Sequence, residues 1–227
     1  MQIAILLYPG FTTLDAVGPF EIISRLPGAE TVFAAKETGP VRNDQGNLAL
    51  VADRTLAEVP GPDIVLVPGT DDWAPVIRDE ETLDWLRTAD ATSTWTTSVC
   101  TGSLILAAAG LLDGRRATSH WLALDELKKY GADPTGERVV FDGKYVTAAG
   151  VSSGIDMGLH LVGRIAGDRH AQSLQLLTEY DPQPPYDAGS PEKAPAEVVA
   201  FWRAGAGRVP DAGQGARDVR GNVTPRR

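Results

Sequence analysis

STWTTSVCTGSLILAAAGLL, residues 93 to 112, is the stretch that decides the fold of this chain. Thr94 to Val99 is a run of β-branched and aromatic residues, which is typical of a strand. The small and apolar residues from Thr101 to Ala109 predict a buried helix, and Gly110 is its expected stop. Cys100, the only cysteine in the chain, lies between the strand and the helix. The stretch therefore predicts a strand, a sharp turn and a helix, with Cys100 in the turn.

The position of Cys100 favours a nucleophile. A residue at a sharp strand-to-helix turn has its side chain exposed at the top of the sheet. Gly102 and Ser103 are small enough to allow a tight turn. The start of a helix carries unpaired N–H groups and a partial positive charge, so we expect a lowered thiol pKa for Cys100. The alternative is a small buried side chain without chemistry, as most lone cysteines are.

The rest of the chain alternates strands with helices, which predicts an α/β fold with a parallel sheet covered on both faces. Helical spacing or apolar content predicts helices at 14–26, 80–91, 121–130, 152–166, 169–179 and 195–204. Apolar or β-branched runs predict strands at 2–8, 31–35, 63–67 and 116–119, with hairpins at 41–51 and 138–148. Ligands of such sheets bind at the carboxyl ends of the strands. We therefore expect the loops at 9–15, 68–73 and 100–102 to converge.

The composition and charge of the chain argue against several classes of protein. The chain has 227 residues and a net charge of −9, which argues against a nucleic-acid surface. One cysteine excludes an internal disulfide and fits the reducing cytoplasm. No signal peptide and no apolar run of about 20 residues that could span a membrane is expected. We predict one domain over residues 1–204 and a flexible tail rich in glycine and arginine over residues 205–227.

Three blocks of the sequence resemble the ThiJ/PfpI superfamily, whose fold is related to class I glutamine amidotransferases. They are LDAVGP at 14–19, SVCTGSLILAAAGLLDGRRATSHW at 98–121 and PPYDAGSP at 184–191. Within the superfamily the chain is most similar to isocyanide (isonitrile) hydratases, over residues 1 to about 204. The resemblance implies a flavodoxin-like three-layer sandwich with a mainly parallel sheet. It also implies a homodimer and no cofactor.

The same resemblance implies roles for individual residues. Cys100 would be the nucleophile, Asp15 the carboxyl group hydrogen-bonded to its sulfur, and Thr101 a further catalytic residue. Many members carry Gly-Gly after the third strand, where this chain has Gly69 and Thr70. We expect both to bind substrate, although Thr70 adopts a positive φ less easily than glycine does.

Other readings of these residues stay open on the sequence alone. Asp15 could simply cap a helix, which is a common role for aspartate. His120 could form a Cys–His dyad with Cys100, bind substrate beside it, or be a structural histidine. His160 and His170 are scattered and there is no second cysteine, so no metal site is predicted.

The predicted function is hydration of an isocyanide, a small-molecule substrate, to an N-substituted formamide through a Cys100 thioimidate. No nucleotide-binding motif is present, and no cofactor is expected. One alternative is another cysteine-dependent activity of the superfamily, such as a glyoxalase or an amidase. A second is a redox sensor in which Cys100 is oxidised to the sulfinate. A third alternative is the sensory domain of a regulator. Such a regulator would need a helix-turn-helix domain at the position where this sequence has only the short tail.

Overall fold

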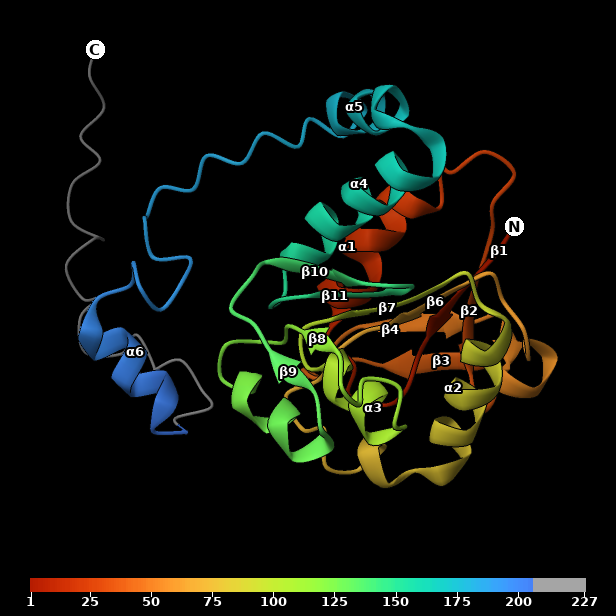
Figure 1. The fold of residues 1–227 in the computed structure, drawn as a ribbon, viewed down its shortest axis with the longest axis horizontal. Helices are drawn as coiled ribbons and strands as arrows, with labels where there is room; N and C mark the ends of the chain where they lie inside the picture. Colours follow the sequence, from red (N-terminus) through yellow and green to blue (C-terminus); the bar gives the residue numbers. More distant parts are fainter. Residues whose placement is uncertain (206–227) are drawn as a thin grey trace, which may run out of the picture. The chain divides into compact units, whose positions relative to one another are not determined.

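A seven-stranded sheet forms the centre of residues 1–182 in the computed structural model of the chain (Figure 1). Its strands run in the order β10-β11-β7-β6-β1-β2-β5, and only the edge strand β10 is antiparallel to its neighbour. The predicted mainly parallel sheet is thus confirmed. The strands are β1 Gln2–Leu6, β2 Glu30–Ala35, β5 Arg54–Thr55, β6 Ile64–Val67, β7 Trp95–Val99, β10 Val139–Asp142 and β11 Tyr145–Ala148.

Helices cover both faces of this sheet, which makes the predicted flavodoxin-like three-layer sandwich (Figure 1). The helices α1 Thr13–Ile23, α4 Ser153–Ala166 and α5 Asp168–Leu177 lie on one side. The helices α2 Glu80–Thr92 and α3 Gly102–Ala108 lie on the other. A 3₁₀ helix, η3 Leu124–Tyr130, packs against α3.

The central strands form the core because both of their faces are covered. All four residues of β6 are fully buried, and so are four of the five residues of β1. Parallel strands inside such a sandwich read as continuous apolar runs, with no alternation of polar residues. The runs at 2–8 and 63–67 therefore gave the right strands from the sequence.

Shorter elements complete the first part of the chain. The predicted hairpin at 41–51 is confirmed as β3 Gly39–Arg42 paired with β4 Ala49–Ala52, a separate two-stranded sheet. A second small sheet pairs β8 Arg116–Ala117 with β9 Asp133–Pro134, so the predicted strand at 116–119 is shorter than expected. Two 3₁₀ turns, η1 Leu56–Glu58 and η2 Val76–Arg78, were not predicted.

The predicted helix at 121–130 is wrong in type. Residues 121–123 form a turn and η3 follows, with hydrogen bonds that span three residues, such as Glu126 N–H to Ala123 O at 3.0 Å. The Leu122 N–H donates to the imidazole of its own turn, His120 Nδ1, at 3.4 Å. That local hydrogen bond competes with the start of a regular helix.

The chain divides into two compact units, residues 1–182 and 183–227, and the structure describes residues 1–205. The described part of the second unit contains α6 Ala196–Arg203, close to the predicted helix at 195–204. Beyond residue 205, the predicted flexible tail lies outside the described residues. Within residues 1–205, no helix has the length and apolar character that crossing a bilayer requires.

Candidate active site

Three loops meet at the carboxyl ends of the neighbouring strands β7, β6 and β1, as the sequence predicted. Cys100 directly follows β7, Gly69 and Thr70 follow β6, and Asp15 lies in the first turn of α1 after β1. The strand order reverses at β1 and β6, which is where sheets of this kind bind ligands.

Cys100 lies in a strained backbone turn. Its φ is 59°, and Glu179 is the only other residue besides glycine with a positive φ in the described chain. Such a conformation costs on the order of 1–3 kcal/mol and persists where neighbouring contacts impose it. The Cys100 N–H donates to Ala148 O at 3.0 Å and to Ala149 O at 3.1 Å. The Cys100 carbonyl oxygen accepts from the hydroxyls of Ser103 and Ser119, each at 3.1 Å.

Gly102 permits this turn by letting two backbones approach closely. A Cβ atom at position 102 would lie 2.2 Å from the carbonyl oxygen of Val67, the last residue of β6. The role predicted for this glycine is therefore confirmed.

Asp15 is completely buried and does not cap its helix. Its Oδ2 accepts the N–H of Gly69 at 3.0 Å, from a loop 54 residues away in sequence. Its Oδ1 has no hydrogen-bond partner among the described residues. The capping reading is wrong because Thr12 holds the N-cap position and the carboxyl group reaches across to Gly69 instead.

Burial raises the pKa of Asp15 to about 7, against the opposing effects of the Gly69 N–H and the Cys100 thiol. The charges of Asp44 and Asp71 raise it further. A carboxyl group with a pKa near neutral can both accept and donate a proton under physiological conditions.

The predicted lowering of the Cys100 pKa is wrong. Burial and then the Asp15 carboxyl raise the pKa of this thiol well above its ordinary value, and hydrogen bonds from Thr101 only partly oppose them. The expectation relied on the helix terminus, but the side chain is only 6% exposed and α3 has just seven residues. At neutral pH the group is therefore a thiol beside a carboxyl group that can take its proton.

Thr101 ties two loops together through its side chain. Its hydroxyl donates to Thr70 O at 2.7 Å and accepts the Thr70 N–H at 2.8 Å. The Gly69 carbonyl oxygen accepts the Thr12 N–H at 2.8 Å. The N–H groups of Gly69 and Thr70 are thus both bonded within the protein, and Thr70 has an ordinary negative φ.

His120 lies near the turn with a neutral ring. Burial lowers its pKa, partly opposed by the charge of Asp71. A Cβ atom on Gly150 would lie 2.2 Å from His120 Cδ2, so the ring packs directly on that glycine. His120 is not among the groups that shift the pKa of Cys100.

Tyr8 is a residue of this site that the sequence reasoning missed. It is 7% exposed, and its hydroxyl donates to the Pro68 carbonyl oxygen at 2.6 Å. Burial and the charges of Asp15 and Cys100 raise its pKa, so it stays a hydrogen-bond donor. The only signal in the sequence was an aromatic hydroxyl at the end of the strand predicted at 2–8, immediately before Pro9-Gly10.

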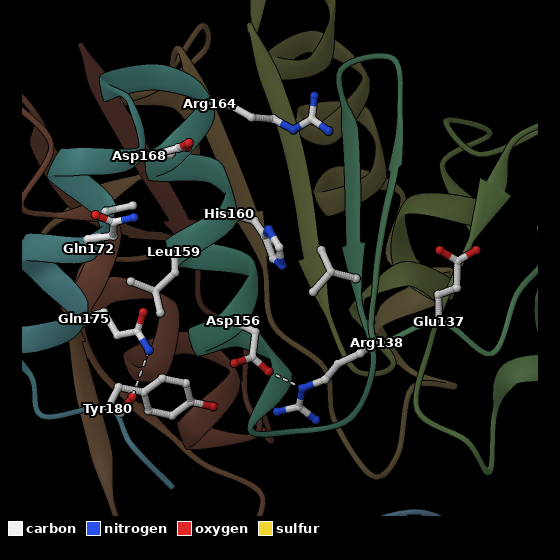
Figure 2. Close-up of a pocket in the computed structure, with 13 residues that line it drawn as sticks. Glu137, Arg138, Asp156, Leu159, His160, Arg164, Asp168, Gln172, Gln175 and Tyr180 are labelled. Atoms are coloured by element: carbon white, nitrogen blue, oxygen red, sulfur yellow. Dashed lines mark hydrogen bonds and ion pairs between the residues drawn. The ribbon is translucent and has the colours of Figure 1, made fainter.

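A cavity of about 920 Å³ lies elsewhere, between β10 and the helices α4 and α5 (Figure 2). An ion pair between Arg138 and Asp156 crosses it, and Gln175 binds the Tyr180 carbonyl oxygen at 3.2 Å. Arg164 lies over the Phe141 ring at 3.9 Å. None of the six predicted site residues lines this cavity. The described residues contain no group of three side chains that could hold a metal ion.

The comparisons with known proteins agree with this fold. The DJ-1/PfpI family model matches residues 1–164. A curated isonitrile hydratase of Pseudomonas putida is 43% identical over 88% of this chain and 87% of its own length. The crystal structure of a ThiJ/PfpI family protein from Pseudomonas syringae superposes with a TM-score of 0.88 and 42% identity, covering 91% of this chain and 86% of that one.

A more distant relative is a transcriptional regulator. An HTH-type transcriptional regulator of Pseudomonas aeruginosa is 32% identical over 77% of this chain, which spans 59% of that regulator's length.

Proposed function

Since this chain belongs to the DJ-1/PfpI family, we propose that it is an isonitrile hydratase, which converts R–N≡C and water to the formamide R–NH–CHO. The observation that carries this proposal is the pairing of the Cys100 thiol with the buried Asp15 carboxyl group. The similarity to the Pseudomonas putida hydratase over most of both chains supports it.

The first half of the reaction forms a covalent intermediate. Asp15 as a carboxylate accepts the thiol proton while the sulfur of Cys100 attacks the terminal carbon of the isonitrile. The carbon gains electron density in this step and takes the proton back from Asp15. The product is the thioimidate R–N=CH–S–Cys100, and the pair has moved one proton from sulfur to carbon.

Water completes the reaction in the second half. Asp15 accepts a proton from a water molecule as the oxygen of that water bonds to the thioimidate carbon, and Asp15 then passes the proton to the nitrogen. The tetrahedral carbon then expels the sulfur as its hydroxyl group loses a proton to Asp15, Asp15 returns this proton to the sulfur, and R–NH–CHO is released. The Thr101 hydroxyl donates its hydrogen bond to Thr70 O and accepts one from the Thr70 N–H. One lone pair of its oxygen is left to accept a hydrogen bond from the water.

The surroundings of the pair favour a neutral substrate. The N–H groups of Gly69 and Thr70 are already bonded, so we assign these residues to the wall of the substrate site and not to an anion-binding hole. Asp44 and Asp71 bring negative charge near Asp15. We also assign His120, with its neutral ring, to the substrate site.

The direct test is to incubate the full chain with a simple alkyl isocyanide and to follow the appearance of the N-alkylformamide. We expect turnover by the wild type and none by Cys100→Ala or Cys100→Ser, both with unchanged far-ultraviolet circular dichroism. A Cys100→Ala protein that kept a tenth or more of wild-type turnover, an order-of-magnitude threshold, would exclude the covalent mechanism. Wild-type protein without formamide production would exclude the proposed activity.

Two further proposals concern the state of the molecule. The resemblance implies a homodimer, and Leu14 on α1 with Leu176 and Leu177 on α5 are exposed apolar side chains that an interface would cover. Light scattering on the purified chain would measure its mass. A cytoplasmic location remains a prediction based on the single free cysteine.

A further inference from the structure

One peptide unit links a tyrosine to the acid of the proposed active site. The carbonyl oxygen of Pro68 and the N–H of Gly69 belong to the same peptide group. The oxygen accepts the Tyr8 hydroxyl at 2.6 Å, and the N–H donates to Asp15 Oδ2 at 3.0 Å. Tyr8, the peptide and Asp15 therefore form one continuous chain of hydrogen bonds.

The peptide is held tightly in this orientation. A Cβ atom on Gly69 would lie 2.6 Å from Thr101 Oγ1 and 2.9 Å from Asp15 Oδ2, so this loop lies directly against both side chains. The Gly69 carbonyl oxygen is fixed separately by the Thr12 N–H. A resonant peptide is planar, so a donor at its oxygen both fixes the direction of its N–H and polarises it.

We propose that Tyr8 is a positioning residue, which keeps the Pro68–Gly69 peptide aimed at Asp15 and thereby sets the proton affinity of that carboxyl group. This inference rests on the proposed function in one respect only, namely that Asp15 serves as the proton carrier of the reaction. Tyr8 itself touches neither the reacting sulfur nor the substrate in this role.

Several other groups also act on Asp15 and must be separated from this effect. Cys100 faces it from the β7–α3 turn, Asp44 from the β3–β4 turn and Asp71 from the loop after β6. Helix α4 packs against α1 through its glycines, which contact Pro19 and Ile22. Tyr8→Phe changes none of these groups and removes a single oxygen atom.

The test measures the carboxyl group directly. The side-chain carboxyls of ¹³C-aspartate-labelled protein are titrated by NMR, and Asp15→Asn identifies the signal. Without the Tyr8 hydroxyl the Gly69 N–H bond weakens, and this bond lowers the Asp15 pKa. We therefore expect Tyr8→Phe to raise that pKa by on the order of half a pH unit.

The matched control is Tyr145→Phe, which removes the hydroxyl that Tyr145 donates to Asp90 at 3.0 Å, from a tyrosine whose exposed fraction is 7%, the same as that of Tyr8. Tyr145 begins β11, at the opposite end of the strand from the Cys100 turn, so the Asp15 pKa should not move. A more acidic phenol, 3-fluorotyrosine placed at position 8, is a stronger donor and should lower the Asp15 pKa.

The two proposals fail in different ways. An unchanged Asp15 pKa in both Tyr8→Phe and the fluorotyrosine protein would overturn the positioning role, whatever the activity of the wild type. Wild-type protein that titrates as expected but makes no formamide would overturn the hydratase proposal and leave the positioning role standing. If Tyr8→Phe does not fold, the fluorotyrosine protein alone decides, because it keeps the hydroxyl.

Discussion

At the scale of single residues, burial is the main influence on the protonation states of Cys100 and Asp15. Both groups have raised pKa values, since burial penalises the charged form of each. Attack by sulfur then requires that the thiol proton leave during the reaction, and Asp15 is the group beside it that can receive it. The two residues titrate as a pair, so their protonation steps belong to both.

The first prediction is the pH dependence of the proposed reaction. The pair is active when it holds one proton, that is, when Asp15 has ionised and Cys100 has not. We therefore expect kcat/KM for an alkyl isocyanide to rise with pH through about 7 and to fall only at alkaline pH, where Cys100 ionises. Initial rates in buffers of constant ionic strength would measure this. A profile that falls as the pH rises through 7 would contradict the assignment of Asp15 as the proton acceptor.

The second prediction concerns Asp15→Asn. The variant keeps the shape of the side chain but cannot carry the proton, so turnover should fall by about a hundredfold or more. Asp125→Asn, on the exposed surface, is the control and should leave turnover unchanged. Near-normal formamide production by Asp15→Asn would contradict the proton-carrier role.

The third prediction concerns the stability of the same variant, Asp15→Asn. The folded-state pKa of Asp15 is about 7 against 3.8 for the free side chain, so its neutral form is favoured in the fold. The protonated Asp15 therefore contributes to the free energy of unfolding of the wild type. This contribution is complete below pH 3.8 and is lost as the pH rises to 7, a change of about 4 kcal/mol at about 1.4 kcal/mol per pH unit. Asparagine does not titrate. The melting temperature of Asp15→Asn relative to wild type should therefore increase steadily between these pH values, and a pH-independent difference would contradict the raised pKa.

At the scale of elements, glycines on α4 set how closely this helix approaches its neighbours. A Cβ on Gly154 would lie 2.9 Å from Pro19 Cδ of α1 and 3.0 Å from Val99 Cγ2, the residue before Cys100. A Cβ on Gly163, in the same helix, would meet nothing closer than 3.4 Å. The two positions thus differ in packing while sharing a helical backbone.

The fourth prediction uses this pair of glycines. Gly154→Ala should destabilise the protein by about 1–3 kcal/mol, because α4 must move away from Pro19 and Val99. Gly163→Ala should be neutral or should stabilise by up to about 1 kcal/mol through helix propensity. Urea unfolding of both variants would measure the difference, and equal stabilities would contradict the close packing of α4.

Prediction from the sequence was most accurate for elements that a single local sequence pattern specifies. The apolar runs gave β1 and β6, and the strand, cysteine and glycine pattern gave the turn at Cys100. Two-residue strands such as β5 and β8 were missed or overextended because they have too few residues for a pattern. The direction of the Cys100 pKa was missed for a different reason. It depends on burial and on the Asp15 carboxyl group, which lies 85 positions earlier in the chain.

At the scale of the whole molecule, the chain is negatively charged and two of its aspartates lie near the candidate site. The chain carries a net charge of −9, and Asp44 and Asp71 both act on Asp15. A potential of this sign lowers the local concentration of anions and leaves neutral molecules unaffected.

The fifth prediction follows from this charge. An isonitrile that carries a carboxylate should have a lower kcat/KM than a neutral isonitrile of the same size. The difference should shrink with added salt, since the screening length falls from about 10 Å at 0.1 M to about 3 Å at 1 M ionic strength. Rates for both substrates across this range would test it, with the neutral compound as control. A salt effect of equal size on both would contradict an electrostatic origin.

The hydrogen bonds from Cys100 N–H to Ala148 O and Ala149 O join the reactive turn to a part of the chain that is synthesised later. A ribosome delivers the chain from its N-terminus, and domains generally fold as units. Residues 1–112 already contain Asp15, Gly69 and Cys100, but they lack the strand β11 that accepts the Cys100 N–H. A nascent chain halted before Tyr145 therefore carries every reactive side chain of the proposed enzyme without the two carbonyl groups that accept the Cys100 N–H.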